Sequence, residues 1–486
     1  MTLVFVTCQS SDKVLIQDFG SNHDIRTFPT YAVCTPHEEL PDHFRCKVSL
    51  HGQVIDYNPK RLRNRLRKSF AYLLSKLLDM PSMTKEYMYR LSWCFGAFPS
   101  GPIRIPDITL HGPELLKEPS FLNHTSGSLV NPLARISMRD THSGFAGIWE
   151  NRDAEVILPA SLVNEPYLIG VLNQPEIFDI VERLDLYTKE EYFTFRVIPI
   201  TSEGMSVISD MDDTLKDTNT PSKKWALSNI FYQKGSPVEN APEAYRSLSL
   251  KGSGKVAFHY LSGSPKAIIH PTNRFLQDNG FPAGSIDLTS LHLTWQGFRH
   301  GLIKKFTNPY SHKNATIQRI LEDLPSRTYL FLGDDIKNDA LIYNDIHKWI
   351  ADRDFTKRAH INRPCIAIRI PSKFTLPEGK MSHRRTIPFQ RTIRMLWDVP
   401  RTHLRFYRNP LALENLDVTS KGCGGIQDID DDREMKAYVQ EFWRLRKKLR
   451  VMRWWHWRQK WQEMRRKQKG EWKKEGNSEK EAGSKV

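Results

Sequence analysis

An acidic turn follows directly on a short hydrophobic run in the middle of the chain. Residues 209–214 are Ser-Asp-Met-Asp-Asp-Thr, and the run 205–208 precedes them. Two carboxylates separated by one residue can share a hard cation. Asp210 can then ligate the cation and attack phosphorus, and Asp212 can protonate the leaving oxygen and later activate water. Alone, the turn is a weak signal, because acidic turns and helix caps are common.

A hydroxyl-rich turn and a lysine follow further along the chain. Residues 262–265 (Ser-Gly-Ser-Pro) end a second hydrophobic run, where the Ser262 hydroxyl and free backbone amides can hold phosphate oxygens at a helix N-terminus. Lys313 stands at the start of a predicted helix, and its charge can neutralise both a phosphate and a carboxylate nucleophile. Taken singly, the turn is explained equally well as a helix cap, and the lysine as a solvated surface residue.

A second acidic turn completes the set. Asp334 follows the hydrophobic run 329–332, so it can add a ligand to a metal site, with Asp335 or Asp339 as direct or indirect support. Phosphate hydrolysis must bring a charged group close to a carboxylate, and a metal together with a cation makes that approach tolerable. The four segments in this order are far more specific than any one of them, and they predict metal-assisted phosphate hydrolysis.

The elements that must position these segments have a recognisable pattern. From 205 to about 370, hydrophobic runs alternate with helical patterns, which is typical of a parallel sheet with crossover helices. The candidate buried strands cover 205–209, 256–261, 329–332 and 365–368. Open α/β folds bind ligands at the carboxyl ends of their strands. We therefore expect the four segments to meet at one edge of the sheet.

The chain before this region has a different pattern. Residues 1 to about 200 contain short alternating runs separated by Gly and Pro, which predict a β-rich domain. Apolar residues recur at helical spacing over 62–77, so a basic helix is expected to pack on that sheet. The predicted domains are a β-rich N-terminal domain (1–200), a catalytic domain (201–375), an extension (376–420), and a linker with a basic, Trp-rich helical tail (421–486).

The net charge of +16 is concentrated in the predicted tail. Residues 442–475 hold fourteen Lys/Arg and three Glu, a net of +11, together with six of the twelve tryptophans. As a helix, this segment presents two apolar seams whose centres differ by about 120°. The first seam is Phe442, Leu445, Leu449 and Met452, and the second is Trp454, Trp457, Trp461 and Met464. The seams suit an anionic membrane surface, packing on the chain's own domain or a protein partner, and less well a nucleic acid.

Composition and cysteine usage narrow the class of protein. With 39% hydrophobic and 26% charged residues, the chain is neither wholly disordered nor collagenous. No run approaches about 18 apolar residues, so no membrane-spanning helix is expected, and the first residues lack the features of a secretory signal. Six cysteines without CxxC spacing predict free thiols in a reducing compartment. These features predict a cytoplasmic protein that associates peripherally with membranes.

The four segments together resemble the motifs of the haloacid dehalogenase superfamily of aspartate-nucleophile phosphotransferases. Residues 206–218 (SVISDMDDTLKDT) and 258–265 (FHYLSGSP) further resemble the actin-patch phosphatidate phosphatase family, and the resemblance covers about 205–345. The chain has Asp335 where that family usually has Ser, Gly263 where it usually has Asn, and Lys266 where it has an aromatic residue. These departures leave the choice of substrate open.

The resemblance implies a fold and a set of roles. The fold is an α/β, haloacid dehalogenase-like Rossmannoid parallel sheet. Asp210 is implied to be the nucleophile and a metal ligand, and Asp212 the general acid and base with its backbone carbonyl on Mg²⁺. Asp334 is implied to bind the same Mg²⁺. The implied phosphate-binding set is Thr214, Ser262, Gly263 and Lys313.

The implied function is Mg²⁺-dependent hydrolysis of phosphatidate, or a related lipid phosphate, to diacylglycerol and phosphate. It would proceed through an aspartyl-phosphate intermediate at an anionic membrane surface, which the C-terminal tail contacts. Two alternatives stay open. The same chemistry could act on a soluble phosphate ester or a phosphoprotein, or the chain could be a recruitment module for membranes or protein partners. A nucleic-acid partner is the least expected.

Overall fold

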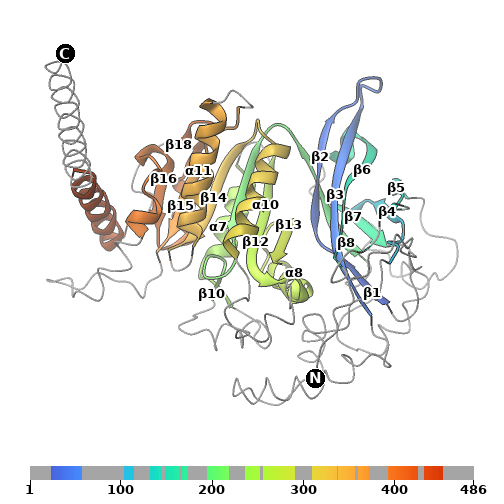
Figure 1. Cartoon of the computed structure of the whole chain (residues 1–486), viewed down its shortest axis with the longest axis horizontal. Helices are drawn as coiled ribbons and strands as arrows, with labels where there is room; N and C mark the ends of the chain where they lie inside the picture. Colours follow the sequence, from blue (N-terminus) through green and yellow to red (C-terminus); the bar gives the residue numbers. More distant parts are fainter. Residues whose placement is uncertain are drawn as a thin grey trace, which may run out of the picture.

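The structure is a computed structural model. It describes residues 23–56, 103–113, 132–138, 140–141, 143, 148–163, 167–172, 194–217, 236–251, 255–289, 309–335, 338–355, 360–370, 392–424 and 432–451. Figure 1 shows a β-rich N-terminal part beside a mixed α/β part, with a C-terminal helix on the far side of the latter. The predicted α/β class, with a parallel sheet and a β-rich N-terminal region, is confirmed.

The N-terminal part is built on one eight-stranded sheet. Its elements are β1 (His23–Thr27), β2 (Thr30–Pro36), β3 (His43–Asp56), β4 (Ile108–His111), β5 (Ala134–Ile136), β6 (Ile148–Pro159), α3 (Ala160–Val163), β7 (Leu168–Leu172) and β8 (Thr194–Thr201). The strand order is β1-β3-β2-β8-β7-β4-β5, and β6 pairs with the long strand β3. Strands β2 and β8 are parallel neighbours, so the last strand of this part in the chain pairs with one of its first strands. The helix predicted over 62–77 lies outside the described residues.

A six-stranded parallel sheet follows in the chain. Its strands are β9 (Met205–Asp210), β12 (Val256–Pro265), β13 (Gly284–Thr289), β14 (Thr328–Asp334), β15 (Cys365–Arg369) and β16 (Leu404–Tyr407). The order β13-β12-β9-β14-β15-β16 is the doubly wound order 3-2-1-4-5-6. The direction of winding reverses between β9 and β14, and in such sheets ligands bind beyond the carboxyl ends of the strands at that reversal.

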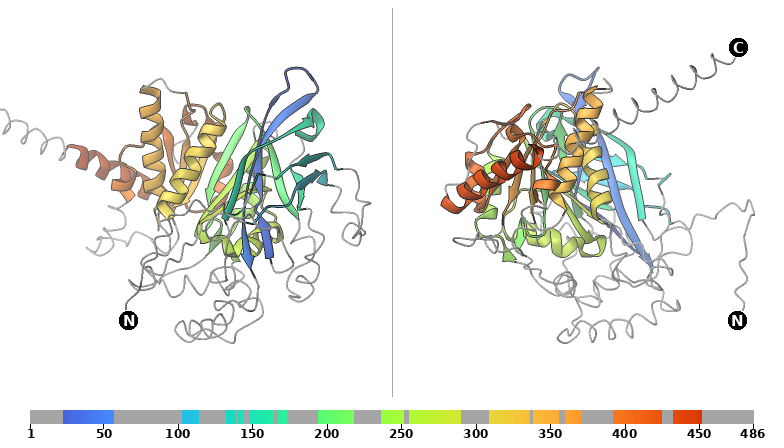
Figure 2. Two further views of the ribbon diagram at one scale, coloured as in Figure 1. Left: turned by 45° about the vertical axis from the view of Figure 1, so that its right-hand side comes forward. Right: turned by 60° about the vertical axis from the view of Figure 1, so that its left-hand side comes forward.

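Helices cover both faces of the parallel sheet (Figure 2). One apolar core lies under α10 (Pro309–Asp323), α11 (Asp339–Phe355) and the C-terminal helix over 433–451. The core on the other face lies under α7 (Ala241–Ser249), α8 (Ile269–Asp278) and the 3₁₀ helix η7 (Pro410–Asn415). Shorter elements are η4 (Lys266–Ile268), η6 (Arg401–His403), the ribbon of β10 (Lys216–Asp217) with β11 (Ser236–Pro237), and the ribbon of β17 (Asp417–Thr419) with β18 (Gly422–Gly424).

A buried arginine ties the two sheets together at the end opposite the acidic turns. Arg327 donates to the backbone carbonyls of Thr201 (2.8 Å), Met205 (2.5 Å) and Lys255 (2.7 Å). Thr201 ends the N-terminal sheet, whereas Met205 begins the parallel sheet. A buried carbonyl without a hydrogen-bond partner costs free energy. The several N–H donors of one guanidinium supply partners to the carbonyls at this junction.

The C-terminal helix packs on the parallel-sheet part. Phe442 is fully buried in the core, and Leu445 and Leu449 pack against the same core. Arg446, although it lies in the basic run, is buried and donates to two backbone carbonyls, each at 2.6 Å. The described part of the first apolar seam (Phe442, Leu445 and Leu449) therefore packs on its own domain. Met452 and the second seam lie outside the described residues. Among the residues that the structure describes, none forms a helix long and apolar enough to cross a membrane.

Four of the six cysteines form disulfides, so the prediction of free thiols is wrong for these four. Cys34 and Cys46 pair across strands β2 and β3. Cys365 of β15 is bonded to Cys423 of β18, 58 positions further along the chain. Such pairings depend on strand register and tertiary packing, which cysteine spacing in a sequence does not reveal. The argument from free thiols for a reducing compartment therefore no longer holds.

Candidate active site

The candidate site lies where the winding of the parallel sheet reverses. Asp210 is the last residue of β9 and Asp334 the last residue of β14, and these two strands are parallel neighbours. Their carboxylates therefore emerge at the same edge of the sheet, where the sequence predicts them. Both side chains are buried, with exposed fractions of 1% for Asp210 and 0% for Asp334.

Lys313 connects the two acidic turns. Its ammonium donates to Asp210 Oδ1 and, at 2.6 Å, to Asp339 Oδ1. The Thr214 hydroxyl donates to the second oxygen of Asp210 at 3.3 Å. Burial by itself lowers the pKa of Lys313, but the charges of Asp210 and Asp339 outweigh it and raise that pKa well above its ordinary value. Lys313 is therefore cationic, and it holds the Asp210 carboxylate in one orientation.

The carboxylate of Asp212 is directed toward the C-terminal end of β12 rather than toward Lys313. Its Oδ2 accepts hydrogen bonds from the Ser262 hydroxyl (2.8 Å) and the Ser264 hydroxyl (3.4 Å). The Ser262 hydroxyl oxygen in turn accepts the backbone N–H of Ser264 at 2.9 Å. Asp212 is only half-buried, so it is better placed than Asp210 to exchange protons with a bound molecule or with water.

The backbone of the first acidic turn explains why Asp210 and Asp212 point in different directions. Asp213 has a φ of 65°, in the left-handed region, which Asp tolerates better than most residues. Its N–H donates to the Lys216 carbonyl at 2.8 Å, and its own carbonyl accepts Arg369 Nη1 at 2.6 Å. Arg369, at the end of β15, thus holds the turn from the neighbouring part of the sheet. The sequence-based prediction missed Arg369, and its position at a strand end was the available signal.

Three carboxylates form a group that could hold a metal ion. Ligand oxygens of Asp210, Asp334 and Asp339 all lie within 4.8 Å of one another. Asp339 Oδ2 is buried and has no hydrogen-bond partner among the described residues. A Cβ at Gly333 would lie 2.8 Å from the Cβ of Asp339, so glycine permits this close approach of α11 to β14. Oxygen donors of this kind suit hard divalent cations, so the donor set fits the predicted metal.

The predicted site residues thus separate into two neighbouring groups. Asp210 and Asp334 lie with Lys313 and Asp339, and the sequence had left Asp335 and Asp339 as alternatives in support. The carboxylate of Asp212 lies with Ser262 and Ser264 instead. Of the remaining predicted residues, Thr214 contacts Asp210, and Gly263 lies between Ser262 and Ser264. The roles assigned to all of them stay predictions.

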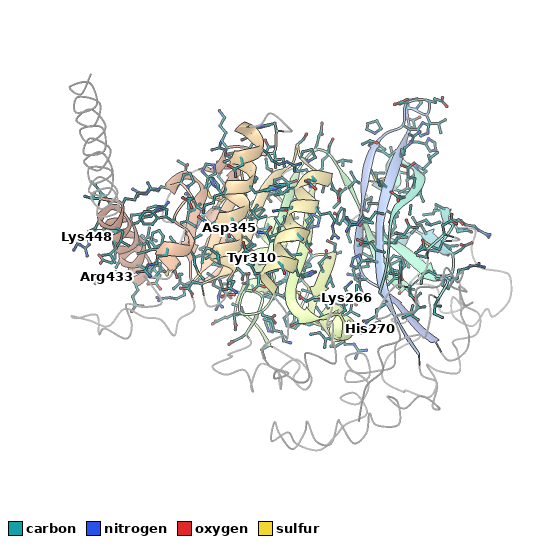
Figure 3. The ribbon with its side chains drawn as sticks, viewed as in Figure 1. Lys266, His270, Tyr310, Asp345, Arg433 and Lys448 are labelled. Atoms are coloured by element: carbon teal, nitrogen blue, oxygen red, sulfur yellow. A yellow bond between two sulfur atoms is a disulfide. The ribbon has the colours of Figure 1, made fainter. Side chains whose placement is uncertain are left out.

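Lys266, which directly follows β12 and begins η4, is directed away from this site. Its ammonium lies 5.3 Å from the ring centroid of Phe28 in the N-terminal part (Figure 3). Burial lowers its pKa, and the carboxylates of Asp287 and Glu150 partly oppose that effect. An aromatic residue is expected at this position from the family resemblance. The presence of Lys266 instead therefore changes a contact with the N-terminal part and not a contact with Asp210 or Asp212.

The chemistry available to this arrangement is nucleophilic attack with acid and base assistance. A carboxylate fixed by a lysine can act as the nucleophile, and a second carboxylate on the same turn can move protons. The cationic Lys313 and the hydroxyls at the C-terminal end of β12 offer positive charge and hydrogen-bond donors to an anionic group. Phosphate monoesters are a class of substrate whose charge and hydrolysis suit this combination.

Comparisons with known proteins agree with this chemistry. Residues 205–353 match the family model described as the catalytic domain of phosphatidate phosphatase APP1. The chain is also similar to phosphatidate phosphatase APP1 of Saccharomyces cerevisiae, with 28% identity over 376 residues. That alignment covers 68% of this chain and 57% of the yeast protein, so the chain spans little more than half the length of this curated relative.

Proposed function

Because residues 205–353 belong to the actin-patch-type phosphatidate phosphatase family, we propose that this chain hydrolyses phosphatidate to diacylglycerol and phosphate. The observation that carries the proposal is the buried Asp210 carboxylate, which Lys313 and Thr214 hold at the carboxyl end of the central strand. Asp212 lies two residues further along the same turn and is half-buried. Together these residues supply a nucleophile, a cation and a proton carrier.

We also propose that the parallel sheet is a haloacid dehalogenase-like Rossmannoid domain. Its doubly wound order and the acidic turn at the end of β9 support this assignment. The proposed units are the β-rich domain (1–200), the catalytic domain (201–375), the extension (376–420), and the linker with the basic tail (421–486). Since β16 pairs with β15, the extension contributes the last strand of the catalytic sheet.

In the proposed mechanism, a carboxylate oxygen of Asp210 attacks phosphorus as the bond from phosphorus to the diacylglycerol oxygen breaks. Asp212 gives its proton to that leaving oxygen, and an aspartyl-phosphate remains. Asp212 then takes a proton from water, whose oxygen attacks phosphorus and releases phosphate, restoring Asp210. Lys313 neutralises charge on the phosphate throughout. A bound Mg²⁺, held by Asp210, Asp334 and the backbone carbonyl of Asp212, with Asp339 beside it, would supply further neutralisation.

The substrate class is tested by phosphate release from phosphatidate in mixed micelles and from soluble esters. The soluble set is p-nitrophenyl phosphate, an inositol phosphate and a phosphoserine peptide. We expect kcat/KM for phosphatidate to exceed that for each soluble ester by about tenfold or more, because contacts with the diglyceride add transition-state binding at about 1.4 kcal/mol per factor of ten. Faster turnover of a soluble ester favours that class of substrate instead. Absence of any phosphate release would favour a recruitment module.

We further propose that the chain works at an anionic membrane surface, and that the residues beyond 451 make the contact. The described part of the C-terminal helix supports this, because its inner face packs on the core while Arg433 and Lys448 project from its exposed face (Figure 3). The segment 452–486 adds eleven Lys/Arg and five further tryptophans. Each basic side chain near an anionic leaflet contributes roughly 1 kcal/mol.

A chain that ends at residue 451 tests this surface without cutting into the core. Ending it before Phe442 would remove buried side chains, and a loss of binding could then reflect unfolding. We expect the shortened chain to bind vesicles containing phosphatidylserine at least about tenfold more weakly, while hydrolysing p-nitrophenyl phosphate at the full rate. Cosedimentation with anionic and neutral vesicles measures this difference. Equal binding by the two chains would contradict the assignment.

A further inference from the structure

Helix α10 carries Lys313 and also contacts the N-terminal sheet. At 100° per residue, Lys313 falls on the same stripe as Ile317 and Ile320, which face the core of the parallel sheet. Arg319 and Asp323 are four residues apart and form a different stripe. The helix therefore has one side that faces the candidate active site and the sheet core, and another that faces the N-terminal part.

The second stripe of α10 is bonded to strands of the N-terminal sheet. The Tyr31 hydroxyl of β2 donates to Asp323 Oδ2 at 2.6 Å. Arg319 Nη1 lies 3.6 Å from Glu150 Oε1 of β6. Tyr31 is 1% exposed, and its ring belongs to the same apolar core as Ile317 and Ile320. The interface is therefore packed around the buried Tyr31 ring, while the carboxylates of Asp323 and Glu150 lie at its exposed edge.

Arg319 also joins α10 to the edge strand β13, which is in contact with the N-terminal sheet. Its Nη2 donates to both carboxylate oxygens of Asp287 at 3.2 Å. Burial alone would raise the pKa of Asp287, but the Arg319 guanidinium outweighs it and holds that pKa well below its usual range. The backbone of β13 is also bonded to the N-terminal part, because the N–H of Ile286 donates to the Pro29 carbonyl at 3.0 Å. Asp287, Arg319 and the N-terminal sheet thus form one continuous set of contacts.

Two further ties of α10 run to α11. The Tyr310 hydroxyl donates to Asp345 Oδ2 at 2.6 Å (Figure 3), and Arg353 Nη1 contacts Glu322 Oε1 at 2.5 Å. Glu322 and Asp323 are neighbours in the chain, yet one is tied to the catalytic part and the other to the N-terminal sheet. This pair provides a matched comparison of the two sets of ties.

We propose that the N-terminal sheet is a positioning element for Lys313, acting through α10 and the contacts of Tyr31, Glu150, Arg319 and Asp323. The inference rests on the proposed function, in which Lys313 neutralises the phosphate. Ten residues of helix separate Lys313 from Asp323, which is about 15 Å. A tilt of only about 4° at the distal end would therefore move the ammonium by about 1 Å, and displacements of that size can cost up to about 100-fold in rate. Tyr31, Glu150, Arg319 and Asp323 are positioning residues and do not touch the phosphate.

The test compares Asp323→Asn and Tyr31→Phe with Glu322→Gln in the full chain, using p-nitrophenyl phosphate. Tyr31→Phe keeps the buried ring, so it serves as a second variant if Asp323→Asn folds poorly. We expect kcat to fall about tenfold in both of the first two variants and to stay unchanged in Glu322→Gln. KM should change less than twofold, because Thr214, Ser262 and Ser264 remain in place. The urea midpoint of unfolding is measured for every variant.

Two results would overturn the proposal. One is a kcat that stays at the wild-type value in Asp323→Asn and Tyr31→Phe. The other is a fall in kcat that tracks the urea midpoint and is matched by Glu322→Gln, since that pattern indicates loss of folded protein rather than displacement of Lys313.

A further measurement separates this proposal from the proposed function itself. If the wild-type chain releases phosphate from no monoester, the phosphatase assignment fails. The coupling is then decided by amide hydrogen exchange over residues 309–317 of α10. Faster exchange there in Tyr31→Phe, relative to Glu322→Gln, supports the coupling. Faster exchange confined to residues 319–323, or none, contradicts it.

Discussion

Replacing Asp210 by Asn is expected to abolish phosphate release from phosphatidate. The side chain keeps its size, but an amide cannot form the bond to phosphorus that a carboxylate forms. Removal of a nucleophile that acts together with its neighbours typically costs about 10⁴- to 10⁶-fold in kcat. Lys313 keeps Asp339 as an ion-pair partner, so the helix that carries it should stay in place. The measurement is release of inorganic phosphate under saturating phosphatidate.

The matched control for this change is Asp278→Asn at the exposed end of α8. It removes the same charge by the same substitution, far along the chain from the acidic turns, and it should retain the wild-type kcat. Undiminished phosphate release by Asp210→Asn would show that another group attacks phosphorus. In that case, the contact between Asp210 and Lys313 would be a structural ion pair.

The strands that carry the site could be predicted because each of them is buried on both faces. In β9, β12 and β14, consecutive apolar residues give hydrophobic runs that end in polar residues, a pattern that locates both the strand and its carboxyl end. Strand β16 was missed because its sequence, LRFY, contains Arg405. That side chain is 1% exposed, and its guanidinium donates to the carbonyls of Cys423 and Gly424, which lie in another ribbon. A strand that contains a buried arginine of this kind looks, in sequence, like a strand exposed at the surface.

Within the site, the residues could be predicted from local motifs, but their grouping could not. Asp210 and Asp212 are two positions apart, and this spacing alone allows both carboxylates to share a cation. The family resemblance implies instead that Asp212 uses its backbone carbonyl. The left-handed backbone at Asp213 instead accompanies a turn in which the Asp212 carboxylate meets Ser262. The third carboxylate of the group comes from Asp339, in the first turn of α11, because Gly333 allows that helix to approach closely. The grouping of these side chains depends on packing between elements, which local motifs do not reveal.

The two largest differences from the expectations drawn from the sequence have the same origin. The disulfide between Cys365 and Cys423 and the burial of Arg446 both involve segments far apart in the chain. The lack of CxxC spacing placed the cysteines among free thiols, and the charge count placed Arg446 in the basic tail without indicating its burial. Contacts made only after folding determine both features, while they leave the strand-end motifs unaffected.

Removing divalent cations is the second change for which we expect a large effect. Asp210, Asp334 and Asp339 carry three negative charges, and Lys313 carries one positive charge, so this buried group has a formal charge of −2. A divalent cation would balance that charge, whereas its absence leaves carboxylates in a buried setting where repulsion is strong. Chelation should therefore stop phosphate release, and Mg²⁺ should restore it.

Binding of the cation has a readout that does not depend on activity. If Mg²⁺ binds the folded chain, it should raise the free energy of unfolding by about 2.7 kcal/mol when its concentration is 100 times the dissociation constant. Asp334→Asn removes one carboxylate from the group and should reduce this increase to a small fraction. Asp335→Asn, the same substitution at the next position, should leave the increase unchanged, because Asp335 lies outside the group of three carboxylates. Urea unfolding with and without Mg²⁺ measures both variants.

One outcome would contradict this assignment. If Mg²⁺ raises the free energy of unfolding equally in Asp334→Asn and the wild-type chain, the cation binds elsewhere. The buried charge of −2 would then need a different partner.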